Sequence, residues 1–160
     1  MEIIEKIRLA LNSHGLKVTP QRIAVYRAIL QLNNHPDTDQ IIAKVTLENP
    51  TISSGTIYKT LDTFAEYNII SRIKTDTGRM RFDHITENHH HLYDKSTDRI
   101  EDYKDEKLNQ LISEYFKKKR IKGFEPIDIK LQIIGKFVES ESSEVQKAEV
   151  QKTGVQKAEV

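Results

Sequence analysis

The hydrophobic pattern of this chain changes before its midpoint, and this change restricts the possible folds more than any other feature. Up to that point, apolar residues recur at helical spacing in four segments, which predict helices over about residues 2–13, 19–32, 37–49 and 52–68. Two short β-prone runs around an Asp/Gly-containing turn then predict a hairpin over residues 69–83. Helices followed by a hairpin are typical of a winged helix-turn-helix, in which helices three and four form the turn motif and the hairpin is the wing.

The second half of the chain predicts a smaller unit that mixes strands with a helix. Two strand-like runs, 89–93 and 99–103, precede an amphipathic helix over about 105–119. Residues 124–137 then alternate apolar and polar side chains, which predicts a strand with one buried face. A unit of this size with an apolar edge strand is completed by pairing with a second copy, so we expect a homodimer.

The expected fold class is therefore α+β, with a winged-helix DNA-binding domain over residues 1–83 and a small α/β dimerisation domain over residues 84–138. Residues 139–160 differ from both, because a five-residue unit beginning Val-Gln-Lys recurs in them. A five-residue period distributes valines all round a helix and forms no continuous apolar stripe. We expect a disordered or marginally helical repeat tail, with an interaction tail as the alternative.

Composition narrows the environment and the chemistry. The 160 residues contain no cysteine, which removes disulfides and thiolate zinc sites. No run approaches the roughly 18 apolar residues that cross a bilayer, and the charged N-terminus differs from a signal peptide, so we expect a cytoplasmic protein without a membrane partner. The net charge of +1 suits a dimer that binds DNA through a small patch and excludes nonspecific coating of DNA.

The segment over residues 81–91 is dense in metal-binding groups, with two carboxylates and four imidazoles. Alternate side chains of a strand share a face, so His89 and His91 point the same way, whereas His84 and His90 are expected to point away from them. The alternative is a solvated turn or the remnant of a purification tag. The internal position of the segment, between apolar residues, argues against a tag.

Two aspartates and a third imidazole complete the candidate set. Asp83 lies within the segment, Asp102 closes the next strand-like run, and His35 begins a predicted helix far upstream. Three imidazoles and two carboxylates without a thiolate suit Fe²⁺, Mn²⁺, Zn²⁺ or Co²⁺, and are a poor cage for Ca²⁺ or Mg²⁺. These five side chains are candidate ligands of one divalent metal, beside the solvated-turn alternative.

The predicted fourth helix offers a DNA-contacting surface, because recognition helices present their N-terminal turns to base edges. With Ile57 and Leu61 buried, four side chains of this helix face outward, and one arginine of the second helix is a further candidate. The expected DNA-binding residues are Ser54, Thr56, Tyr58, Lys59 and Arg22. Arg79 and Arg81 of the wing are weaker candidates for phosphate contacts, and a half-buried packing role is the alternative for Tyr58.

Several short motifs occur in an order that resembles one known family. They are Thr19-Pro20-Gln21-Arg22, His35-Pro36, Ile52-Ser53 with Thr56-Ile57-Tyr58, Arg81-Phe82-Asp83, His89-x-His91 and Ile100-x-Asp102. Together they are similar to the ferric uptake regulator (Fur) family of metal-dependent transcription factors, over about residues 3–137. The resemblance implies a repressor that binds double-stranded operator DNA as a homodimer. It also implies one regulatory divalent metal per subunit, Fe²⁺ or Mn²⁺ with Zn²⁺ as an in vitro substitute, held by His35, Asp83, His89, His91 and Asp102.

The aspartate at position 102 resembles the peroxide-sensing (PerR) branch, whereas iron-sensing members usually have a glutamate there. In that branch, bound Fe²⁺ reacts with hydrogen peroxide and a ligand histidine is oxidised, which implies His35 or His89 in this chain. The damaged ligand no longer holds the metal, and the repressor leaves DNA. Sensing of iron, manganese, zinc or haem without a peroxide response is the alternative, and haem-responsive members (Irr) also carry a run of three histidines.

One departure from the family is plain. Most members hold a structural zinc with two CxxC pairs, but the corresponding positions here are Asp94, Thr97, Phe137 and Ser140. We therefore expect no structural zinc and a C-terminal strand held by apolar packing alone. A metal-dependent enzyme and a metal-free winged-helix regulator are the remaining alternatives. The sequence has no HExxH motif, and we expect no enzymatic activity.

Overall fold

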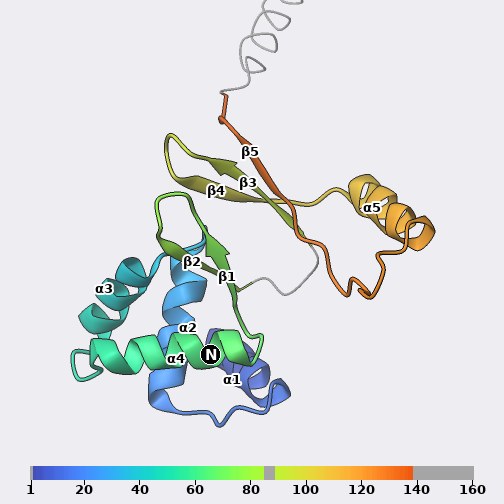
Figure 1. The fold of residues 1–160 in the computed structure, drawn as a ribbon. Coiled ribbons are helices and arrows are strands. Elements are labelled where there is room, and N and C mark those ends of the chain that lie inside the picture. Colours follow the sequence, from blue (N-terminus) through green and yellow to red (C-terminus); the bar gives the residue numbers. More distant parts are fainter. Residues whose placement is uncertain (1, 85–88, 139–160) are drawn as a thin grey trace, which may run out of the picture.

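Four helices, a hairpin and a small mixed sheet follow one another along the chain (Figure 1). The structure is a computed structural model that describes residues 2–84 and 89–138. Its N-terminal helices are α1 (Glu2–Ser13), α2 (Pro20–Leu32), α3 (Thr38–Glu48) and α4 (Ser54–Glu66). The other elements are β1 (Ser71–Lys74), β2 (Met80–Asp83), β3 (His90–Asp94), β4 (Arg99–Tyr103), α5 (Glu106–Lys118) and β5 (Gln132–Gly135). This order confirms the expected α+β fold class, in which a winged helix (α1–α4 with β1 and β2) precedes a second sheet (β3–β5).

The four N-terminal helices share one apolar core. Two predicted N-caps are present, since the Thr19 side chain accepts the Arg22 N–H at 3.3 Å and the Ser53 hydroxyl accepts the Thr56 N–H at 3.2 Å. Each such cap stabilises a helix by about 1 kcal/mol. The core draws one or more side chains from the predicted stripe of every helix, among them Ile7, Val25, Ile41, Ile57 and Phe64. Helix ends lie within two residues of the predicted ones, which is the range over which helix ends fray.

The β1–β2 hairpin is the wing, and it lies between the helices and the second sheet (Figure 1). Its strands pair antiparallel, and Gly78 takes the positive φ of 77° in the connecting turn, where a side chain would be strained. Phe82 of the wing packs into the helical core. Ile73 of the wing is buried instead with Tyr93 and Ile100 of the second sheet. The wing therefore contacts both parts of the molecule.

The second sheet has the strand order β4-β3-β5. Its central strand β3 pairs antiparallel with β4 and parallel with β5, and α5 projects to one side of the sheet (Figure 1). The predicted amphipathic helix over 105–119 is confirmed by α5, but its apolar side chains Leu111 and Tyr115 are exposed. Phe124 and Ile127 in the following loop are exposed as well. This part of a single chain thus presents an extended apolar surface.

The strand predicted over residues 124–137 is wrong for most of its length, since the sheet takes up only Gln132–Gly135. The preceding segment contains a bridge between Ile121 and Phe124 and a turn with Gly123 at a φ of 75°. This turn ends at Phe124, and of the residues that follow only Gln132–Gly135 pair with β3, so the first half of the predicted strand is a loop. All four residues of β5 are exposed in the single chain, in contrast to the buried face that the alternation predicted.

The expectation that apolar packing alone holds the C-terminal strand is also wrong. Asp94 Oδ2 accepts the backbone N–H of Phe137 at 3.3 Å, and the Arg99 guanidinium lies 4.1 Å from the centroid of the Phe137 ring. Hydrogen bonds, the largest from the Ser96 hydroxyl, outweigh burial and lower the pKa of Asp94 to about 2. The carboxylate is therefore a charged acceptor at neutral pH, and it ties the end of the strand to the β3–β4 turn.

The tail expected over 139–160 lies outside the described residues, as do residues 85–88 of the histidine-rich segment. Within the two described ranges, no helix combines the length and the apolar content needed to cross a membrane.

Candidate metal centre

The loop after α2 carries His35 to the edge of the wing. The run Asn33–His35 has φ angles of 50°, 47° and 57°, which asparagine and histidine adopt more readily than most residues. The Phe82 N–H donates to the Pro36 carbonyl at 3.0 Å and fixes this loop alongside β2. These contacts bring His35 next to Asp83, the last residue of β2.

Three further ligand candidates come from the second sheet. His91 on β3 pairs directly with Asp102 on β4, and His89 immediately precedes β3, so strand alternation turns its side chain to the same face as that of His91. The structure brings together all five candidates predicted from the sequence, with one donor atom of each within 4.8 Å of all the others. The five residues are His35, Asp83, His89, His91 and Asp102.

The separations between donor atoms fit a shared metal ion. Nε2 of His89 lies 2.9 Å from Oδ2 of Asp83, 3.1 Å from Nε2 of His91 and 3.3 Å from Oδ1 of Asp102. Nε2 of His35 lies 2.8 Å from the same Asp102 oxygen. Donor atoms that each bind one ion at about 2.1 Å lie about 3 to 3.5 Å apart at octahedral and tetrahedral angles. The three nitrogens and two oxygens are therefore spaced as ligands of one transition metal would be.

The centre is shielded from solvent on most sides. His89 is fully buried, His35, Asp83 and His91 are at most 6% exposed, and the Asp102 side chain is 28% exposed. Burial lowers the pKa of His35, and the neighbouring carboxylates of Asp102 and Asp83, which raise it, do not reverse this effect. The imidazole is thus held in the neutral form, which is the form that donates a lone pair to a metal. The carboxylates of buried Asp83 and partly exposed Asp102 supply negative charge for a divalent cation to neutralise.

A small polar cavity opens onto the more exposed side of the centre. Its volume is about 220 Å³. Its lining is Asn33, Asn34, His35, Asp83, His84, Glu101 and Asp102. Because a water molecule occupies about 30 Å³, the cavity has room for several waters and gives an ion or a small polar molecule a path to the donor atoms.

The remaining described histidines are not part of this donor set. His90 points away from the centre, as strand alternation predicts, and is fully buried on the opposite side of β3. Its Nδ1 accepts the Leu131 N–H at 3.2 Å, which anchors the start of β5. His84 lines the cavity beside the centre, and His14 at the end of α1 places Nδ1 2.8 Å from the Ala10 carbonyl oxygen.

The outer side of α4 carries the residues expected to contact DNA. Ile57 and Leu61 are buried, as predicted, and the side chains on the opposite face are exposed. The exposed residues are Ser54, Thr56, Tyr58 and Lys59. Tyr58 is 50% exposed, which leaves its ring available for an external contact. Arg22 is half-buried and donates to the Lys17 carbonyl at 2.7 Å, so part of its donor capacity is used within the chain.

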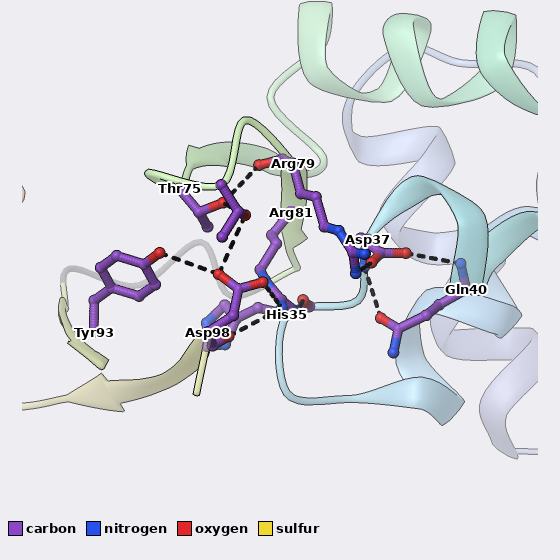
Figure 2. A network of polar contacts seen from close by, with 9 residues as sticks. His35, Asp37, Gln40, Thr75, Arg79, Arg81, Tyr93 and Asp98 are labelled. Carbon is purple, nitrogen blue, oxygen red and sulfur yellow. Dashed lines mark hydrogen bonds and ion pairs between the residues drawn. The ribbon is translucent and has the colours of Figure 1, made fainter. Parts of the chain in front are cut away.

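The Arg81 guanidinium, a candidate for phosphate contacts, is engaged within the chain instead. Its side chain is 13% exposed and donates to the Asp98 carboxylate and the His35 carbonyl (Figure 2). Sequence reasoning missed Asp98 altogether, because no local pattern connects the wing with the β3–β4 turn. It also missed the left-handed run Asn33–His35, for which two successive asparagines were a usable signal.

Comparisons with known proteins agree with this geometry. The model of the ferric uptake regulator family matches residues 13–134. The chain is 31% identical to the peroxide-responsive repressor PerR of Staphylococcus aureus over 108 residues, which cover 68% of this chain and 73% of the relative. A similar solved structure is the Campylobacter jejuni peroxide stress regulator, with 25% identity, a TM-score of 0.64, and coverage of 88% of this chain and 99% of that one.

A further similar structure supports the fold alone. It is the ferric uptake regulator from Pseudomonas aeruginosa with manganese, which is 19% identical with a TM-score of 0.70, and the match covers 83% of this chain and 98% of that one. The family match spans both the winged helix and the second sheet. The chain therefore belongs to the ferric uptake regulator family, whose members are metal-responsive transcription regulators rather than enzymes.

Proposed function

We propose that this chain is a metal-dependent repressor in which one divalent metal per subunit joins the winged helix to the second sheet. The observation that carries the proposal is the convergence of donors from both parts within 4.8 Å. His35 and Asp83 belong to the winged helix. His91 and Asp102 lie on strands of the second sheet, and His89 immediately precedes its strand β3. An ion held by both groups fixes the angle between the two parts, and with it the separation of the two recognition helices of a dimer.

Metal binding favours the DNA-binding pose only by as much as the ion binds that pose more tightly than the others. Shifting an equilibrium from 1:99 to 99:1 needs roughly 5.5 kcal/mol. A pose in which the winged helix turns away leaves the ion three protein donors, whereas the converged pose offers five. Four protein ligands bind structural Zn²⁺ with a free energy of about 10–16 kcal/mol. The binding free energy that two additional donors contribute is therefore of the magnitude that the shift requires.

The donor set favours Fe²⁺ or Mn²⁺ as the regulatory metal, with Zn²⁺ as an in vitro substitute. The sequence has no cysteine to hold a structural zinc. Peroxide is the proposed signal, and the similarity to the Staphylococcus aureus peroxide-responsive repressor supports it. With Fe²⁺ bound, hydrogen peroxide adds one oxygen atom to the imidazole of His35 or His89 and releases the other in water. The damaged ligand then no longer holds the metal. Regulation by iron, manganese, zinc or haem without a peroxide response is the alternative signal.

We infer a homodimer that binds double-stranded operator DNA in the cytoplasm. The domain over 1–83 contributes α4 as the recognition helix, and the domain over 84–138 contributes α5 and the loop after it to the dimer. Exposed apolar side chains of this region, including Tyr115 and Ile127, suit burial against the same surface of a second copy. Residues 139–160 are proposed as a tail outside both domains.

Selection from random duplex DNA tests the proposed function. Purified protein is incubated with the pool in the presence of Mn²⁺ or of EDTA, and bound duplexes are recovered over several rounds. We expect Mn²⁺ to enrich a palindromic sequence, because a two-fold dimer presents two recognition helices to two half-sites. Equal enrichment in EDTA contradicts the metal dependence, and a lack of enrichment under both conditions contradicts the DNA-binding role.

Replacing Lys59 with alanine is expected to weaken operator binding and to leave Mn²⁺ binding unchanged. Each lost phosphate contact reduces the slope of log affinity against log salt by about 0.9. The salt dependence of operator binding, measured by fluorescence anisotropy, reports this change. The matched control is Lys6→Ala, which removes the same charge from the exposed side of α1. Equal salt slopes for Lys59→Ala and Lys6→Ala contradict a DNA contact by Lys59.

A further inference from the structure

A second contact joins the winged helix to the second sheet without using any of the five ligand candidates. Arg81 on β2 lies beside Asp98 in the β3–β4 turn, with Arg81 Nη2 2.6 Å from Oδ2 of Asp98 and 3.0 Å from its backbone oxygen (Figure 2). The Arg81 side chain is 13% exposed and the Asp98 side chain is 19% exposed. A charge pair shielded from water in this way interacts more strongly than an exposed pair and is costly to break.

The same guanidinium also reaches the loop that carries one ligand candidate. Arg81 Nη1 donates to the backbone carbonyl of His35 at 3.1 Å. His35 has a φ of 57°, a conformation that persists only where surrounding contacts hold it. One side chain thus links the turn of the second sheet, the wing and the loop that directs the His35 imidazole toward the centre.

Neighbouring side chains hold Asp98 in place. The buried Tyr93 donates its hydroxyl to Oδ1 of Asp98 at 3.1 Å, and Thr77 of the wing donates to the same oxygen at 3.4 Å. Burial raises the pKa of Asp98, but the Arg81 guanidinium and the two hydroxyls outweigh it and lower the pKa overall. Ile73 of the wing packs against Tyr93 in a small apolar cluster behind these groups. The wing therefore meets the second sheet through both charged and apolar contacts.

We propose that Arg81 and Asp98 are positioning residues that bias the metal-free protein toward the pose in which the five ligand candidates converge. The inference rests on the proposed metal function, because its consequence is a higher metal affinity. A protein whose binding-competent pose is only partly populated binds its ligand more weakly by that fraction. Loss of the Arg81–Asp98 contact therefore lowers the population of the converged pose, and the metal affinity falls by the same factor.

The backbone conformation at Asp98 allows the side chain to be removed without strain. Its φ of 56° lies in the left-handed region that glycine favours, so Asp98→Gly removes the carboxylate and preserves the turn. Arg81→Lys keeps the positive charge but loses the planar fork that spans Asp98 and His35. The matched control is Asp62→Ala, which removes an ion pair with Arg72 that lies within the winged helix.

The first measurement is the Zn²⁺ affinity of the full chain, determined by competition with a chelating dye. We expect Asp98→Gly and Arg81→Lys each to weaken Zn²⁺ binding about 10-fold, the low end of the range for residues that orient metal ligands. The double variant is expected to lose less than the product of the two single effects, because the residues form one contact. Asp62→Ala is expected to bind Zn²⁺ as the unmodified chain does.

The second measurement separates positioning from general stabilisation. Because the chain has no cysteine, Glu66→Cys on α4 and Glu114→Cys on α5 provide two exposed sites for spin labels. Labelled chains are diluted into an excess of unlabelled chains, so that only distances within one chain are measured. In EDTA, we expect the distance of the converged pose to be less populated in Asp98→Gly than in the labelled parent. Saturating Zn²⁺, which is diamagnetic, is expected to give both proteins the same distance.

An unchanged Zn²⁺ affinity in Asp98→Gly, or an unchanged distance distribution in EDTA, overturns the proposal. A lower unfolding temperature without these two changes assigns the contact a purely structural role and overturns it as well. If the parent chain binds no Zn²⁺, the metal function fails, and the distances in EDTA still decide whether the contact biases the pose.

Discussion

Replacing Asp83 with alanine is expected to abolish metal-dependent operator binding in a chain that remains folded. The Asp83 carboxylate supplies one of the two negative charges of the centre, and its Oδ2 lies 2.9 Å from Nε2 of His89 and 3.5 Å from Nε2 of His91. Residues that only orient metal ligands are worth 10–100-fold in affinity, so loss of a charged ligand is expected to weaken Mn²⁺ binding by at least about 100-fold. Because Asp83 belongs to the winged helix, its loss also removes much of the preference of the ion for the converged pose.

Fluorescence anisotropy of a labelled operator duplex, titrated with Mn²⁺, measures this effect. His35→Asn is expected to give the same result and suits the positive φ of that position better than alanine would. His14→Ala is the matched control, since it removes an imidazole at the end of α1 and leaves the centre intact. Circular dichroism is expected to show the helical content of the unmodified chain in all three variants. Metal-dependent binding that survives in both Asp83→Ala and His35→Asn contradicts the proposed linkage.

Hydrogen peroxide is expected to release the Fe²⁺-loaded protein from its operator and to leave the Mn²⁺-loaded protein bound. His35 and His89 are the expected targets, and a ligand that gains an oxygen atom on its ring no longer fits the centre. The cavity of about 220 Å³ beside His35 gives a small oxidant access to the donor atoms. Loss of one ligand then reverses the equilibrium that the metal maintains.

Peptide mass spectrometry after a brief peroxide treatment tests this directly. We expect the mass of one added oxygen atom on the peptide carrying His35 or His89 in the Fe²⁺ form, and the unmodified mass in the Mn²⁺ form. The peptide carrying His14 is the internal control, because this residue lies outside the centre. Two outcomes contradict peroxide sensing: release from DNA without an added oxygen on either ligand peptide, and continued DNA binding by the Fe²⁺ form. Either outcome indicates that the protein senses the metal itself.

The features that could be predicted from the sequence are those with local signals. Thr19 and Ser53 combine a capping side chain with an amphipathic run, and both begin helices in the structure. The placement of His89 and His91 on the same side follows from strand alternation, and their Nε2 atoms lie 3.1 Å apart in the structure. The other three ligand candidates were chosen for their donor types, the family resemblance implied the same three, and the fold brings all five to the same point.

The features that escaped prediction depend on contacts between distant segments. An exposed wing arginine and a buried one look identical in sequence, and only the packing of the wing on the second sheet gives Arg81 its partner Asp98. The alternation over 124–137 likewise predicted one long strand, because a period of two does not show which residues find a partner strand, and only Gln132–Gly135 pair with β3. A hydrogen bond from Phe137 to Asp94 and the stacking of Arg99 on the Phe137 ring support the strand end, where apolar packing alone was expected.

Anomalous X-ray diffraction from crystals grown with Mn²⁺, recorded on both sides of the manganese absorption edge, tests the central proposal most directly. The proposal predicts one strong anomalous peak per subunit, bounded by His35, Asp83, His89, His91 and Asp102. A manganese peak elsewhere in the chain with these five side chains apart from one another would contradict it.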